Sequence, residues 1–99
     1  MRNFNLMKRQ KTSQMTFDSF KLLVGRSLLN CEYWQKPKLS SYYANIHTKG
    51  ISFTFGYNFV TKKWELSYLD KDYEDIPDLL TVVSLISQVQ SLEGEYSNA

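Results

Sequence analysis

Apolar and polar residues alternate with a period of two through three successive segments between Tyr42 and Tyr68. This alternation is typical of strands that bury one face and expose the other. Aromatic residues make up 15% of the chain and occupy many of the apolar positions, which suits a half-buried pleated surface. We therefore predict a three-stranded antiparallel meander, with strands that begin near Tyr42, Ile51 and Trp64.

The turn at Lys49-Gly50 sets the predicted register of the first hairpin. A two-residue turn there pairs Ile46 with Phe53 and keeps the apolar residues on one face. A three-residue loop with Gly50 as a bulge would instead place Ile46 opposite Ser52, and the two faces would mix. The alternation of apolar and polar residues therefore favours the two-residue turn.

A turn at Thr61-Lys62 gives the second hairpin the same buried face. The predicted facing pairs are Phe59–Trp64, Tyr57–Leu66 and Phe55–Tyr68. The two hairpins were placed independently and agree on one buried face, which is the strongest internal evidence for the meander.

A first amphipathic helix is predicted from about residue 17 to residue 33. Thr16 is a good N-cap, and Asp18 places a negative charge in the first turn. Apolar residues follow at spacings of three and four: Phe17, Phe20, Val24, Leu28 and Cys31. Pro37 ends the segment, because the residue before a proline avoids the helical region.

A second helix is predicted after an acidic connector at residues 70–78. Asp75 is its expected N-cap, Pro77 falls in its first turn, and Gly94 is its expected stop. The apolar stripe consists of Ile76, Leu79, Leu80, Val83, Ile86 and Val89.

The predicted fold class is therefore α+β, in the order α-β-β-β-α, with both helices packed on one face of the meander. Residues 1–15 are predicted to be a basic, flexible arm, residues 16–94 a single domain, and residues 95–99 a frayed tail. The strand that begins at Tyr42 would be an unpaired edge in this arrangement, and the other face of the sheet would be open to solvent.

Composition excludes several classes of protein. Cys31 is the single cysteine, so an intrachain disulfide is ruled out, and the chain has no apolar run long enough to span a bilayer. The first residues also lack the apolar stretch of a signal peptide. We expect a cytoplasmic location.

No catalytic, metal or cofactor site is predicted. His47 is the only histidine and has no orienting partner in the sequence, and Cys31 falls on the apolar stripe of the first helix, as a small buried hydrophobe would. The alternating acids Asp70, Asp72 and Glu74 do not fit a calcium loop, because Asp75 stands where that loop needs glycine.

Charge is distributed unevenly along the chain. Residues 1–15 and 33–64 contain cations and no acids, whereas eight of the ten acids follow from Glu65 onward. The order α-β-β-β-α is also that of the double-stranded RNA-binding domain, whose last helix begins with phosphate-binding lysines. Here that helix begins with Glu74, Asp75 and Asp78, so the family does not fit.

Two functions follow as hypotheses. The first is a non-enzymatic protein-binding or regulatory module, of the kind found on phages and mobile elements. It would bind a protein partner, or a second copy, through the first-strand edge, with contacts at Tyr43, Asn45 and His47. The alternative is a nucleic-acid-associated protein that contacts phosphates with the arm and the lysines near the turns, namely Arg2, Lys8, Arg9, Lys11, Lys36 and Lys38.

Overall fold

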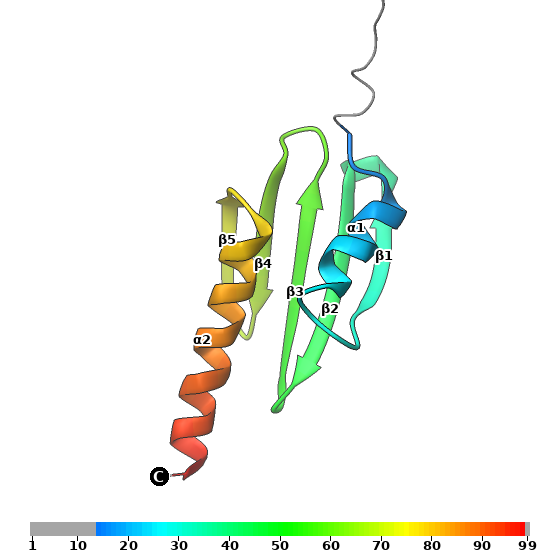
Figure 1. The fold of residues 1–99 in the computed structure, drawn as a ribbon. Helices are drawn as coiled ribbons and strands as arrows, with labels where there is room; N and C mark the ends of the chain where they lie inside the picture. Colours follow the sequence, from blue (N-terminus) through cyan, green and yellow to red (C-terminus); the bar gives the residue numbers. More distant parts are fainter. Residues whose placement is uncertain (1–13, 99) are drawn as a thin grey trace, which may run out of the picture.

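A five-stranded antiparallel sheet carries two helices on one face in the computed structural model, which describes residues 14–98 and their side chains as far as Leu92 (Figure 1). In chain order the elements are α1 (Phe17–Gly25), β1 (Glu32–Lys36), the short 3₁₀ helix η3 (Pro37–Leu39), β2 (Ser41–Thr48), β3 (Ile51–Asn58), β4 (Lys63–Tyr68), β5 (Lys71–Ile76) and α2 (Leu79–Asn98). The strand order is β1-β2-β3-β4-β5, so each strand pairs only with its neighbours in sequence. The α+β class is confirmed, and the sheet has five strands rather than three because β1 and β5 flank the predicted meander.

The core lies between the sheet and both helices. Phe53 and Phe55 from β3 are fully buried, as are Phe20 from α1 and Val82 from α2. The ring of Phe20 stacks on Trp64 of β4, with centroids 5.7 Å apart, so α1 reaches the middle of the sheet. The alternating apolar residues therefore bury the face that was predicted from the sequence.

The first hairpin has the predicted register. Ile46 pairs with Phe53, and Thr48 pairs with Ile51 across a two-residue turn. Lys49 has φ 53° and Gly50 has φ 80°, and two successive positive φ values are the geometry that a tight hairpin turn requires.

The second hairpin differs from its predicted register by two residues. Tyr57 pairs with Trp64, rather than with Leu66, and Phe59 lies outside the ladder. Its amide donates to the Ser40 carbonyl oxygen at 2.9 Å, and its ring packs on Tyr42 at 5.2 Å. A shift of two residues keeps every side chain on its own face, so the apolar pattern could not distinguish the two registers.

The predicted helix at residues 17–33 is too long. Thr16 does cap α1, since its Oγ1 accepts from the Ser19 amide at 3.1 Å, but the helix ends at Gly25. A turn follows in which Asn30 has φ 64°, and the chain then forms β1. Leu28 and Cys31 pack on the core from this turn, so their helical spacing was coincidental.

The predicted acidic connector contains a fifth strand. Tyr73 pairs with Leu66 and Ile76 with Trp64, with a bulge between them at which Asp75 has φ 56°. The bulge places the two inward residues three positions apart, which hides the strand period in the sequence.

The second helix begins at Leu79, later than predicted, and its N-cap is Asp78. The Asp78 Oδ1 atom accepts from the Thr81 amide at 2.9 Å and from the Thr81 hydroxyl at 2.7 Å. Asp75 lies in the β5 bulge, so the cap predicted there is wrong. The helix also continues past Gly94 to Asn98, so the predicted stop is not observed.

β2 is not an edge strand, because β1 pairs with its outer side from Glu32↔Asn45 to Lys36↔Ser41. The sheet edges are instead β1 and β5. Within residues 14–98, neither helix has the length and apolar character needed to cross a bilayer.

Candidate functional site

The helix-free face of the sheet carries side chains in rows that run across the strands. The backbone register defines three of these rows. The cationic row is Lys36, Ser41, Asn58 and Lys63; the aromatic row is Trp34, Tyr43, Gly56 and Glu65; the acidic row is Glu32, Asn45, Thr54, Ser67 and Asp72. Successive rows are separated by two residues, or about 7 Å along a strand. The face therefore changes from basic to aromatic to acidic along the strand direction.

Tyr43 is the centre of the aromatic row. Its ring covers Gly56 so closely that a Cβ at position 56 would lie 2.6 Å from the Tyr43 Cδ1 and Cε1 atoms. Trp34 stacks beside it, with ring centroids 5.8 Å apart and planes inclined by 16°. The Lys36 ammonium stands 5.4 Å from the Tyr43 ring centroid, where it interacts with the negative face of the ring.

The Tyr43 hydroxyl reaches across β3 towards Glu65. Burial, and then the negative charge of Glu65, raise the pKa of Tyr43 above the usual value of 10.0. Tyr43 is therefore neutral at ordinary pH. The close approach of its ring to Gly56 and its stacking with Trp34 make the aromatic row a formed surface.

The cationic row lies at the end of the sheet where η3 and the β3–β4 loop meet. The Asn58 amide donates to the Leu39 carbonyl oxygen at 3.3 Å, and its Oδ1 accepts from the Val60 and Thr61 amides at 2.8 and 2.9 Å. These bonds, with the Phe59–Ser40 backbone bond, join two segments that are about twenty residues apart in sequence. Lys38 in η3 and Lys62 in the loop are thereby brought next to the row.

The lysines at this end are exposed: Lys36, Lys38, Lys62 and Lys63. Among the side chains described up to Leu92, the one ion pair is Lys21–Asp18 on α1, so none of the four has a carboxylate partner there. Their charge is therefore available to an anionic partner.

Short hydrogen bonds connect side chains of the acidic row to one another and to Ser52. The Asn45 Nδ2 atom donates to the hydroxyls of Ser52 and Thr54 at 2.8 and 2.9 Å, and the Ser67 hydroxyl donates to Asp72 Oδ1 at 2.6 Å. Asn45, predicted as a protein contact, is thus a half-buried part of the sheet surface. His47 is exposed one row further on and pairs with Ser52, as predicted.

The structure brings together some of the residues predicted to contact nucleic acid. Lys36 and Lys38 lie at the same end of the sheet, whereas Arg2, Lys8, Arg9 and Lys11 lie outside the described residues. Met15, near the start of the described residues, lies at that end too. The Tyr42 hydroxyl donates to its carbonyl oxygen at 3.0 Å. Met15 also packs against the core.

Trp34 is the site residue that the sequence interpretation missed. It directly follows the helix predicted at residues 17–33, and no strand was predicted there. The alternation of Glu32, Trp34 and Lys36 with Tyr33 and Gln35 was the available signal, but five residues are too few to establish a period.

Neither the Cys31 thiol nor a metal-binding cluster forms a second candidate site among the described residues. Burial raises the pKa of the Cys31 thiol, which disfavours a reactive thiolate, and the thiol faces the Leu28 carbonyl oxygen at 4.0 Å. In the part of the chain that the structure describes, no three His, Cys, Asp or Glu residues are grouped to hold a metal ion.

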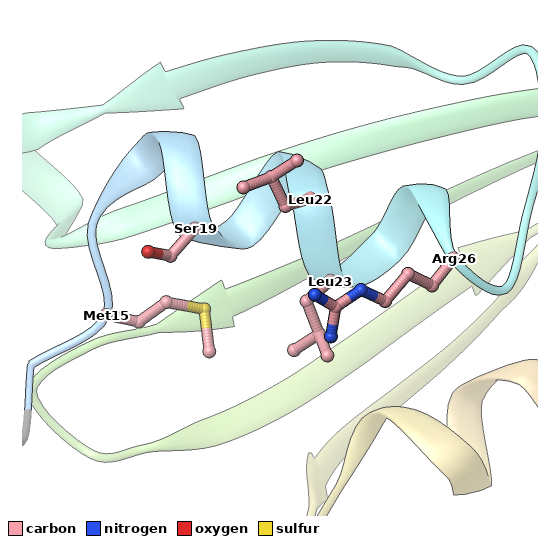
Figure 2. Close-up of a pocket in the computed structure, with 5 residues that line it drawn as sticks. All are labelled: Met15, Ser19, Leu22, Leu23 and Arg26. Carbon is pink, nitrogen blue, oxygen red and sulfur yellow. The ribbon is translucent and has the colours of Figure 1, made fainter.

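A hollow of about 280 Å³ lies beside α1, on the helix side of the sheet. Figure 2 shows its lining residues, Met15, Ser19, Leu22, Leu23 and Arg26. Arg26 is the one ionisable group among them, so the hollow contains no acid–base pair or nucleophile with a base. The helix-free face is the better candidate for function.

The chain matches no protein-family model, no curated protein and no solved structure at a significant level.

Proposed function

We propose that this protein is a non-enzymatic binding module and that the helix-free face of its sheet is the recognition surface. The observation that carries the proposal is the aromatic row, in which Trp34 and Lys36 are assembled around a Tyr43 ring that covers Gly56. Aromatic rings with a cation beside them are typical of contact surfaces. A reducing, cytoplasmic setting belongs to the same proposal, since Cys31 is a free thiol.

The mode of binding differs from the one expected from the sequence. A partner strand cannot pair with the outer side of β2, because β1 already pairs there. The new edges are poor templates, since β5 is charged and bulged and β1 is short and followed by Pro37. A protein or nucleic-acid partner would therefore lie across the face.

Site-specific photocrosslinking tests the surface without assuming the class of partner. A photoreactive amino acid replaces Glu65, which is exposed in the aromatic row, or Leu22, which is 67% exposed on α1. We expect adducts in a lysate of the source organism from position 65, and few from position 22.

Competition tests whether the adducts depend on the aromatic row. Excess unlabelled wild-type protein should remove the adducts, and an excess of the Trp34→Ala variant should not. Adducts that form equally from both positions, or none from position 65, would contradict the proposal. Circular dichroism of each variant shows that the loss of competition is not a loss of fold.

A further inference from the structure

We infer that the partner is a single-stranded nucleic acid that crosses the strands, with its phosphates on the cationic row and its bases against the aromatic row. This inference rests on the proposed function, because it names the partner of the same face. It was not available from the sequence, because the strand that carries Trp34 was not predicted and the lysines are far apart along the chain.

The cationic row supplies the phosphate contacts. Lys36 and Lys63 lie at its two ends on β1 and β4, and three strand spacings put their Cα atoms roughly 14 Å apart. Lys38 and Lys62 extend the positive surface from the adjoining turns. Ser41 and Asn58 between the two ends carry no charge, so the whole row is electrostatically favourable to a polyanion.

The aromatic row favours an unpaired strand. Trp34 and Tyr43 lie one row behind the lysines, about 7 Å along the strands, and Lys36 connects the two rows above the Tyr43 ring. Bases can stack on such rings only when they are not already stacked in a duplex. A flat anionic membrane touching the end of the sheet would not use the aromatic row, which is set back on the face.

The acidic row limits where the strand can lie. Glu32 and Asp72 stand at its two ends, and Glu65 closes the aromatic row on the β4 side. Phosphates are repelled from this half of the face and attracted to the lysine end. The binding path is therefore confined to one end of the sheet.

The test measures binding of the full chain to a fluorescent oligothymidine of about 20 nucleotides, by anisotropy and by quenching of tryptophan fluorescence. Lys38→Glu/Lys63→Glu removes two of the phosphate contacts. Lys49→Glu/Lys71→Glu makes the same change in net charge at the opposite end of the sheet and is the matched control. A duplex of the same length and anionic lipid vesicles are the alternative partners.

We expect the first variant to bind about tenfold more weakly and to show a smaller salt dependence, and the control to change by about twofold or less. Trp34→Ala should weaken single-strand binding by about tenfold and remove most of the quenching, because Trp64 is buried.

Equal losses in the two double variants, tighter binding to duplex or vesicles, or no binding would overturn the inference. If nuclease-treated lysate still gives protein adducts from position 65, the recognition face survives and only the partner class is wrong. If untreated lysate also gives no adducts from that position, the proposed function fails as well.

Discussion

The ring of Tyr43 covers Gly56, with its Cδ1 and Cε1 atoms 2.6 Å from where a Cβ would stand. The glycine is needed because of this close approach, since its backbone conformation is an ordinary extended one. An aromatic ring that covers a glycine on the neighbouring strand compensates for the missing side chain. The consequence is that one methyl group at position 56 should disturb the whole aromatic row.

We predict that Gly56→Ala lowers the free energy of unfolding by about 1–3 kcal/mol, because the Tyr43 ring must move or the strands must part. Chemical denaturation measures the loss. In a Tyr43→Ala background the same substitution should cost less, since the ring is absent and only the Tyr42 carbonyl oxygen, at 3.1 Å, remains close. An equal cost in both backgrounds would mean that the ring does not constrain position 56.

Asn58 connects η3 to the β3–β4 loop through three hydrogen bonds. Asn58→Ala should lower the free energy of unfolding by about 1–2 kcal/mol, because two amides and a carbonyl lose a partly buried partner. Asn58→Asp keeps the two acceptor bonds and should be intermediate. A variant as stable as the wild type would show that these bonds form equally well with water.

Leu69 adopts φ 53° in the β4–β5 turn, a conformation that costs a side chain with a Cβ roughly 1–2 kcal/mol. Its side chain is 72% exposed, so little apolar burial is lost when it is replaced. Leu69→Asn should therefore raise the free energy of unfolding by about 1 kcal/mol. A thermal melt is sufficient to test this, and an unchanged or lower melting temperature would contradict it.

Asp78 caps α2, and its hydrogen bonds from the Thr81 hydroxyl and amide lower the pKa of its carboxyl group below the usual 3.8. Asp78→Ala should lower the melting temperature at neutral pH, whereas Asp75→Gly should not, because Asp75 sits at φ 56° in the bulge.

The pH dependence of the cap follows from the sign of this shift. A lowered folded-state pKa contributes stability above the unfolded value and loses it as the pH falls through the folded value. The difference in melting temperature between the wild type and Asp78→Ala should therefore become smaller in acid. A difference that stays constant from neutral pH into strong acid would show that the carboxylate charge has no role in the cap.

The three central strands and the buried face could be predicted from the sequence because burial imposes a period of two over many residues. The first hairpin register also followed, since a slip of one residue would have exposed Phe53. The register of the second hairpin did not follow, because a slip of two residues leaves every side chain on the same face. The observed register depends on the hydrogen bonds of the Asn58 side chain and on the packing of Phe59, which no local pattern contains.

The outer strands were missed for a related reason. In β1 the inward Tyr33 packs against Phe20, the outward Trp34 packs against Tyr43, and two successive aromatic residues show no alternation of polarity. In β5 the bulge breaks the period. The candidate site depended on β1, so the aromatic row could not be assembled from the sequence even though Tyr43, Asn45 and Lys36 were singled out individually.

The consecutive strand order has a consequence for how the chain reaches this structure. Each strand pairs with the one just before or after it, so the sheet can grow by zipping one short hairpin onto the next. Only small loops close at each step, and the entropy of loop closure stays low. Low contact order of this kind favours rapid folding for an antiparallel sheet and shortens the time during which the aromatic residues are open to aggregation.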